Sequence, residues 1–182
     1  YTRMACLHQK GIDFRDTLPE QLRDLKVALD RAGQIACWQK TLEHLEPKPG
    51  ERHLDLGCGA GLFTYELYKL PCKYYGVDFC QEIVDEVTRS LAKEKFSNVV
   101  SVLKADADDL PYDDRFFDLA TCLGLLEYYP PEYRRKVLGE LRRVLKNHGR
   151  AAVDYPNPLN PTIYDALQIE AFRGSRLFLE DL

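Results

Sequence analysis

The sequence lacks three features that would each assign it to a large class of proteins. No apolar run approaches the roughly 18 residues that a membrane-spanning helix needs, and no signal peptide is visible. Basic residues are not in excess: the formal net charge is −4, which argues against a dedicated nucleic-acid binder. The six cysteines form no C-x-x-C pair. Neither they nor the four histidines show zinc-ligand spacing, so we expect no metal site.

What remains is the composition of an ordinary globular protein. At 182 residues the chain forms one domain by default and is long enough to bury a sizeable core. Hydrophobic residues make up 45% and charged residues 30%, both usual for globular domains. Because unpaired cysteines are typical of a reducing compartment, we expect the six to be partly buried thiols of a cytoplasmic protein.

One stretch, HLDLGCGAG at residues 53–61, organises the chain. It predicts a short buried strand that runs into a turn with Gly57, Gly59 and Gly61 at every second position, followed by a helix from about Leu62. Glycines allow positive φ and a close approach of the backbone to a ligand, while the helix directs its free N–H groups to the same place. The stretch therefore predicts a polar or anionic ligand group there; the alternative is a tight turn with no ligand.

Apolar periodicity predicts the other elements. The helical segments are Pro19–Glu46 (interrupted at Gly33), Leu62–Leu70, Gln81–Lys95 and Pro131–Asn147, and the further strands are Lys73–Val77, Val99–Lys104, Phe116–Leu123 and Ala151–Asp154. This order implies an α/β fold with a doubly wound, mostly parallel sheet. The step from the third to the fourth strand then requires either a short helix or a long crossover. We expect Gly149 to close the last helix.

Acidic residues follow the next two strands. Asp78 stands at the end of the second strand, 17 residues after Gly61, where a carboxylate can accept two hydrogen bonds from a ribose diol. Asp106 follows the third strand and can accept from an adenine amino group, while the N–H of Ala107 can donate to a ring nitrogen. Each acid alone could be a helix cap or a solvated turn residue. Together with the glycine turn, their positions after successive strands predict an adenosine site.

The spacing G-x-G-x-G, rather than the dinucleotide pattern G-x-G-x-x-G, resembles the motif of class I S-adenosylmethionine (SAM)-dependent methyltransferases. Four further segments are similar to those of the family: YGVDF at 75–79, ADADDLP at 105–111, FFDL at 116–119 and LRRVLKNHG at 141–149. The resemblance covers about residues 52–155. It implies a doubly wound, Rossmann-like core with SAM as the methyl donor and S-adenosylhomocysteine as the product.

The resemblance also implies roles for individual residues. Asp55 would support the loop, and Gly57, Cys58, Gly59 and Gly61 would face the methionine part of SAM. Asp78 would bind ribose, Phe79 would lie beside adenine, Asp106 and Ala107 would read adenine, and Cys122 and Leu123 would lie near the sulfonium.

The resemblance implies transfer of a methyl group to a small-molecule acceptor by direct displacement. Many relatives carry a histidine after the fourth strand, but this chain has none there, which leaves Glu127, Tyr129 and Tyr155 as the nearest candidates for a base. Two other readings stay open. One is a non-catalytic SAM-binding or scaffold subunit, and the other is a nicotinamide-dependent oxidoreductase, which the glycine spacing disfavours.

We expect three parts along the chain: residues 1–50 as a helical cap and lid, 51–155 as the SAM-binding core, and 156–182 as a loop and helix at the acceptor pocket. A full class I domain is expected to add two further strands, for which residues 156–182 are too few. The sequence thus predicts that these strands are missing from the 182 residues, and its start at Tyr1 rather than Met leaves room for an upstream segment.

Basic residues concentrate in the last predicted helix: Arg134, Arg135, Lys136, Arg142, Arg143 and Lys146. They could form a nucleic-acid patch. We favour the solvent-exposed face of an amphipathic helix, because cations near a helix C-terminus suit its dipole.

Overall fold

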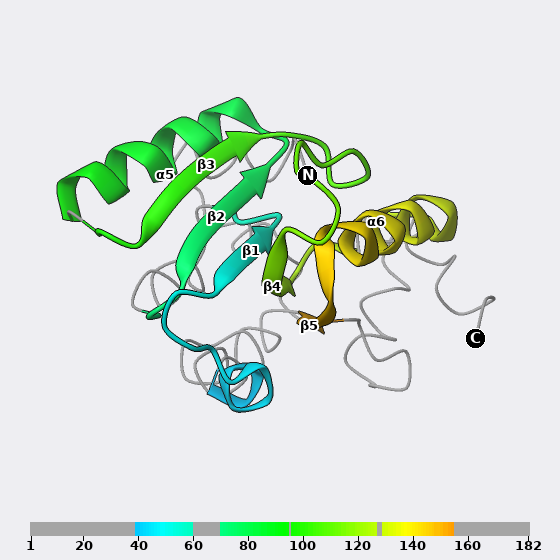
Figure 1. The fold of residues 1–182 in the computed structure, drawn as a ribbon. Coiled ribbons are helices and arrows are strands. Elements are labelled where there is room, and N and C mark those ends of the chain that lie inside the picture. The colour runs from blue at the N-terminus through cyan, green and yellow to red at the C-terminus, as the bar shows by residue number, and fades with distance from the viewer. Residues whose placement is uncertain (1–38, 60–69, 95, 127–128, 155–182) are drawn as a thin grey trace, which may run out of the picture.

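The fold is described from a computed structural model, in which residues 39–59, 70–94, 96–126 and 129–154 are described (Figure 1). The strands are β1 Arg52–Leu56, β2 Lys73–Asp78, β3 Val99–Lys104, β4 Phe117–Cys122 and β5 Leu145–Val153, and the helices are α5 Gln81–Glu94 and α6 Pro131–Val144. Residues 39–45 are also helical. Within the described ranges, no helix combines the length and the apolar character needed to cross a membrane.

All five strands lie in one parallel sheet in the order β3-β2-β1-β4-β5. This confirms the predicted fold class. From β1, the strands β2 and β3 are added on one side of the sheet and β4 and β5 on the other. The loop after β1 therefore lies at the switch in strand order, where ligands bind in such sheets. Residues 19–38 of the predicted segment Pro19–Glu46, residues 62–69 of the predicted helix Leu62–Leu70 and all residues after 154 lie outside the described residues.

The two faces of the sheet are covered by different helices (Figure 1). Because side chains alternate along a strand, Leu54 and Leu56 of β1 point to one face and His53 and Asp55 to the other. The first face packs against α6 in the larger core cluster, and the second lies on the side of α5. Helices on both faces make the sheet doubly wound.

The end of α6 differs from the prediction. The helix stops at Val144, and β5 begins at once with Leu145, so the helix does not continue to Asn147 and Gly149 does not close it. The reason lies in the neighbours: Leu145 pairs with Phe117 of β4, and the carbonyl of Arg143 accepts the N–H of Arg115. Leu138 of this helix is apolar but 44% exposed.

The connection from β3 to β4, residues 105–116, is a long crossover without a helix. It passes over the α6 side of the sheet, where Tyr112 and Phe116 pack around Tyr75 with ring centroids 6.1 and 5.6 Å from it. Aromatic side chains here take the place that a helix occupies in most parallel crossovers.

Arg150 of β5 fastens the helical turn 39–45 to the sheet. Its guanidinium donates to the carbonyl oxygens of Leu45 at 2.7 Å and Glu46 at 3.3 Å. It also pairs with both carboxylate oxygens of Glu51, at 2.8 and 2.9 Å. A single side chain thus joins the start of the described chain to its last strand.

Candidate functional site

The glycine loop leaves β1 with the backbone that its sequence predicts. Gly57 and Gly59 have φ values of +73° and +50°, in the left-handed region that favours glycine. The N–H groups of Gly57 and Cys58 both donate to the carbonyl of Val77 at 2.9 Å, which ties the loop to β2. A side chain at position 57 would also meet Leu125, whose Cδ1 lies 3.1 Å from the ideal Cβ position.

Asp78 links the end of β2 to this loop. Its Oδ2 accepts the N–H of Gly59 at 3.0 Å, and its Oδ1 accepts the N–H of Cys80 at 3.0 Å. The residue is only 2% exposed, and burial raises the pKa of its carboxyl group. A carboxylate has about four lone-pair positions, and the backbone N–H groups of Gly59, Cys80 and Phe79 do not use all of them, so Asp78 can still accept from a diol while it holds the loop.

Asp55 lies beneath the loop, on the α5 side of the sheet. Its two oxygens accept hydrogen bonds from the hydroxyls of Tyr74 at 2.7 Å and Thr121 at 2.9 Å, which joins β1 to both neighbouring strands. Burial raises the pKa of Asp55 to about 6, although both hydrogen bonds act in the opposite direction. Burial raises the pKa of the Cys58 thiol well above its ordinary value, and the negative charges of Asp55 and Asp78 raise it further.

Gly76 makes room for this arrangement. It pairs with Asp55 across the two strands, and a Cβ on it would lie 3.1 Å from the ring and hydroxyl of Tyr74. The missing side chain therefore lets the Tyr74 ring cross to Asp55. Sequence reasoning did not identify Tyr74, Gly76 or Thr121 as support for the loop; the signal was a glycine within a strand, which often marks a close approach.

His53 extends the same polar group of residues. Its Nε2 lies 3.0 Å from the hydroxyl oxygen of Thr121. Because Thr121 gives its one hydrogen to Asp55, its oxygen accepts from His53, so Nε2 carries the proton. Nδ1 is buried without a partner among the described residues, and burial lowers the pKa of His53 to about 4.

Asp106 and Ala107 lie beyond the end of β3, as predicted. The N–H of Asp109 donates to the carbonyl of Asp106 at 3.2 Å, which closes a tight turn around Ala107. Burial is the main cause that raises the pKa of Tyr129, and the negative charges of Asp78 and Asp106 raise it further. The N–H of Ala105 donates to the carbonyl of Asp78 at 3.1 Å, so the ends of β2 and β3 lie side by side.

Tyr129 itself packs against an aromatic neighbour. Its ring stacks on that of Tyr133 with centroids 4.4 Å apart, and its carbonyl accepts from Arg134 Nε at 2.6 Å. Burial, followed by the charge of Asp108, raises the pKa of Tyr133 to about 12. Both hydroxyls are therefore poorer bases at neutral pH than an ordinary tyrosine.

The other predicted site residues are only partly brought into this group. Phe79 is half-buried directly after β2. Cys122 ends β4, but its side chain is fully buried in the α6-side core, and Leu123 packs toward the α5 side. Gly61, Glu127 and Tyr155 lie outside the described residues.

Comparison with known proteins gives a family. Residues 54–153 match the family model described as a methyltransferase domain, which is more than half of the chain. The chain belongs to the class I SAM-dependent methyltransferases. SAM is the cofactor of this family, so the expectation drawn from the glycine spacing is confirmed.

Individual relatives agree with the family. The chain is 36% identical over 147 residues to YcgJ, an uncharacterized methyltransferase of Bacillus subtilis, and 32% identical over 131 residues to a demethylmenaquinone methyltransferase of Lactobacillus johnsonii. These matches cover 79% and 69% of this chain, but 54% and 53% of the relatives, so the chain spans about half the length of the curated relatives it matches.

Solved structures give the same fold. The crystal structure of Bacillus subtilis YcgJ is similar with a TM-score of 0.61 and 27% identity over 70% of this chain and 54% of that one. A SAM-dependent methyltransferase from Aquifex aeolicus has a TM-score of 0.57 and 24% identity over 72% of this chain and 75% of that one, which supports the fold.

The groups that the methyltransferase core presents fit an adenosine cofactor. Two carboxylates, from Asp78 and Asp106, stand at neighbouring strand ends and can accept from a diol and from an amino group. Glycines with positive φ allow the backbone after β1 to approach a ligand closely. This set of acceptors is the observation on which the assignments below depend.

The basic residues of α6 do not form one exposed patch. Arg135, Lys136 and Arg142 are exposed, as expected for the polar face of the helix. Arg134, by contrast, is 5% exposed, and Arg143 is half-buried against the crossover. The interpretation as a solvated face is therefore wrong for these two arginines.

Proposed function

We propose that this protein transfers a methyl group from SAM to a small-molecule acceptor, with the cofactor held at the carboxyl ends of β1, β2 and β3. The observation that carries this proposal is that Asp78 joins the glycine loop to the start of the turn at Asp106: its side chain accepts the N–H of Gly59, and its carbonyl accepts the N–H of Ala105 at 3.1 Å. Hydrogen-bond acceptors that lie together beside the glycine loop match the diol and amino groups of adenosine. Membership of the methyltransferase family identifies the methyl donor as SAM.

The proposed roles follow from position. The carboxylate of Asp78 accepts from the ribose hydroxyls, and Asp106 with the N–H of Ala107 binds the adenine edge. Residues 57–61 face the methionine part, and Phe79 lies beside the base. For Cys122, whose thiol lies in the core, any contact near the sulfonium is limited to the backbone.

SAM, when bound, supplies a methyl group that its sulfonium already activates. Transfer therefore depends on alignment of the acceptor more than on acid–base help, and such positioning can lower a barrier by about 7–11 kcal/mol. Tyr129 is better suited to be a wall of the pocket than a base, because burial raises its pKa. We assign no base among the described residues.

We propose a planar, apolar acceptor as the first class to test. The Lactobacillus johnsonii relative is named as a demethylmenaquinone methyltransferase. The stacked rings of Tyr129 and Tyr133 pack against the same core cluster as Ala107 of the proposed adenosine site. Residues 1–50 and 156–182 are proposed to complete the acceptor pocket around the core 51–155. A reducing compartment such as the cytoplasm suits the cysteines of the described residues, Cys58, Cys72, Cys80 and Cys122, which form no disulfide.

Calorimetric titration with S-adenosylhomocysteine and with NAD tests the cofactor. We expect the first to bind and the second not to bind. In Asp78→Asn, the amide keeps one oxygen but loses the charge, so affinity for S-adenosylhomocysteine should fall about 10- to 100-fold. Asp85→Asn on the exposed side of α5 is the matched control and should bind normally. NAD binding alone would overturn the proposal, and unchanged affinity in Asp78→Asn would contradict the ribose assignment.

Transfer itself is tested with SAM labelled in the methyl group and a panel of acceptors that includes reduced demethylnaphthoquinones. We expect label to appear in at least one small molecule. Tight cofactor binding without transfer to any acceptor of the panel, with the full-length protein, would favour a non-catalytic SAM-binding subunit.

A further inference from the structure

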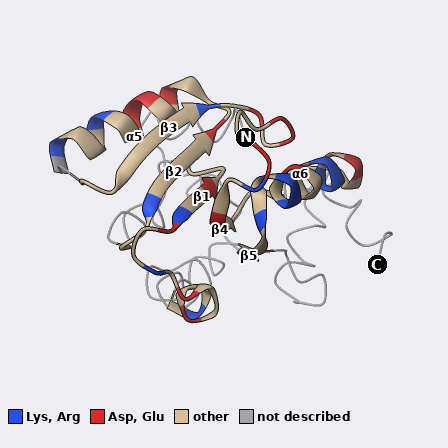
Figure 2. Cartoon of the chain, in the orientation of Figure 1, with Lys and Arg blue, Asp and Glu red and all other residues tan. Residues whose placement is uncertain are grey.

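The crossover 105–116 carries the proposed adenine contacts but has no helix of its own. Its regular structure is limited to turns and an isolated bridge between Asp106 and Asp109. Figure 2 shows this acidic crossover running beside the basic residues of α6. A segment of this length with little internal hydrogen bonding needs outside support to hold one conformation.

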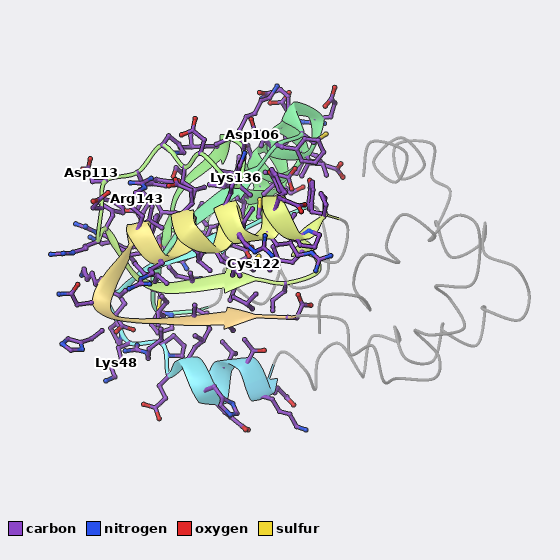
Figure 3. All side chains as sticks on the ribbon, turned by 90° about the vertical axis from the view of Figure 1, so that its right-hand side faces the viewer. Lys48, Asp106, Asp113, Cys122, Lys136 and Arg143 are labelled. Atoms are coloured by element: carbon purple, nitrogen blue, oxygen red, sulfur yellow. The ribbon has the colours of Figure 1, made fainter. Side chains whose placement is uncertain are left out.

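Two side chains of α6 provide that support at Leu110. Glu140 Oε2 accepts the N–H of Leu110 at 2.8 Å, and Arg143 Nη2 donates to its carbonyl at 3.0 Å. The backbone of one residue is therefore held on both sides. Arg143 Nη1 also donates to the carbonyl of Tyr112 at 2.8 Å and to Asp114 Oδ1 at 2.9 Å. Figure 3 shows Arg143 near Asp113, at the end of α6 where the crossover returns.

Glu140 and Arg143 are also paired with each other. Arg143 Nε and Nη2 donate to the two carboxylate oxygens of Glu140, each at 2.8 Å. The backbone carbonyl of Arg143 accepts from Arg115 at 2.9 Å. A planar guanidinium can serve the carboxylate and three crossover oxygens at once, whereas a lysine ammonium cannot reproduce this fork. We call Glu140 and Arg143 the clamp pair.

The clamp pair lies close to the residues that face adenine. Leu110 directly follows the turn from Asp106 to Asp109, and its side chain is buried in the core. We propose that Glu140 and Arg143 are positioning residues that set the preference of the cofactor site for adenine by fixing the turn that contains Asp106 and Ala107. This inference rests on the proposed SAM-binding function.

The same helix and crossover offer a matched control. Lys136 and Asp108 also form an ion pair between α6 and the turn, but it is 3.9 Å long and the Lys136 side chain is 69% exposed. Exposed pairs of this kind contribute little. Lys136→Gln thus removes a charge from the same interface without removing the clamp.

The experiment compares three ligands in the wild-type protein, Arg143→Lys, Glu140→Gln and Lys136→Gln. S-inosylhomocysteine replaces the adenine amino group with a carbonyl, and S-(2′-deoxyadenosyl)homocysteine lacks one ribose hydroxyl. For each protein, calorimetry gives two ratios: affinity for S-adenosylhomocysteine over the inosyl analogue, and over the deoxy analogue. Urea unfolding and circular dichroism confirm that each variant is folded.

We expect the adenosyl-to-inosyl preference to fall about tenfold in Arg143→Lys and in Glu140→Gln, because charge-assisted hydrogen bonds hold the turn. The preference over the deoxy analogue should stay, since the carboxylate of Asp78 is held by the N–H groups of Gly59 and Cys80 and not by the clamp pair. A purely structural role would lower both ratios together or neither, and either result would overturn the inference. If Arg143→Lys does not fold, Glu140→Gln decides. Wild-type protein that binds none of the ligands would instead refute the proposed function.

Discussion

The two faces of the sheet beneath the cofactor site are built on opposite principles. On the α6 side, Tyr75, Tyr112, Phe116 and Phe117 form a packed aromatic cluster in which ring centroids lie 4.8–6.1 Å apart. On the α5 side, the same central strands bury a chain of hydrogen bonds from His53 through Thr121 and Asp55 to Tyr74. The first face is stabilised by the packing of large aromatic side chains, and the second by buried hydrogen bonds.

The two faces therefore respond to different changes: one to the loss of side-chain atoms, and the other to a change of pH. Packing is sensitive to lost atoms and insensitive to pH, whereas a buried acid next to a buried imidazole responds to pH without any loss of volume. The polar face lies directly under the glycine loop, because Asp55 is two residues before Gly57. A change in protonation therefore acts on the side of the sheet that supports the glycine loop.

The largest effect should come from the apolar face. Phe117 is completely buried, with its ring centroid 5.3 Å from that of Tyr75 and 4.8 Å from that of Tyr112. Phe117→Ala should lower the free energy of unfolding by about 3–5 kcal/mol, measured by urea denaturation. Leu138→Ala, at a position 44% exposed on α6, is the control and should cost well under half as much. Equal losses of stability for the two variants would contradict the view that packing around Phe117 stabilises this face of the sheet.

An intermediate effect should appear on the polar face as a function of pH. The native pKa of Asp55 is about 6 against 3.8 in the unfolded chain, so acidification from pH 6 toward 4 stabilises the fold. His53 has a native pKa of about 4 against 6.5, so the unfolded chain takes up its proton first and acidification over the same range destabilises the fold. The two contributions oppose each other in the wild-type protein.

His53→Gln separates them, because the amide still donates to Thr121 but does not titrate. Between pH 6.5 and 4.5 the variant should gain about 2–3 kcal/mol of unfolding free energy relative to the wild type. Asp55→Asn should change in the other direction. Urea unfolding at three pH values measures both. Curves that stay parallel to that of the wild type would mean that neither group carries the shifted pKa.

The smallest effect should be a gain. Gly139 lies on the exposed side of α6, and a Cβ added there would meet nothing within 4 Å. Gly139→Ala should therefore raise the free energy of unfolding by roughly 0.5–1 kcal/mol, through helix propensity alone. The stability should rise equally at pH 7 and pH 5, in contrast to His53→Gln. A loss of stability would indicate that position 139 contacts a neighbour.

Sequence periodicity predicted β1 to β4 and the helices α5 and α6 well, because each has an apolar face of the right period. The range Val99–Lys104 was correct at both ends, and β2 differed only by the inclusion of Asp78. The start of β5 was wrong, since a helical pattern continues through Leu145 and only the pairing with Phe117 turns that residue into a strand.

Site residues that directly follow a strand could be predicted from the sequence. Residues that act through contacts between distant segments of the chain could not. Asp78 and Asp106 are visible from order alone. The link from Tyr74 to Asp55 depends on the absence of a side chain at Gly76, and the clamp pair depends on a crossover that returns past α6. Glu140 and Arg143 are three residues apart on a helix, a spacing that by itself indicates no more than an ion pair on the helix surface.

Arg150 has a consequence for synthesis of the chain. Its contact with the carbonyl of Leu45 joins residues 105 positions apart. At about 5–20 residues per second, the helical turn 39–45 leaves the ribosome roughly 5–20 seconds before the arginine that fastens it. During that interval one of the earliest described segments has no attachment to the strand that later holds it, so its docking must await nearly complete translation of the core.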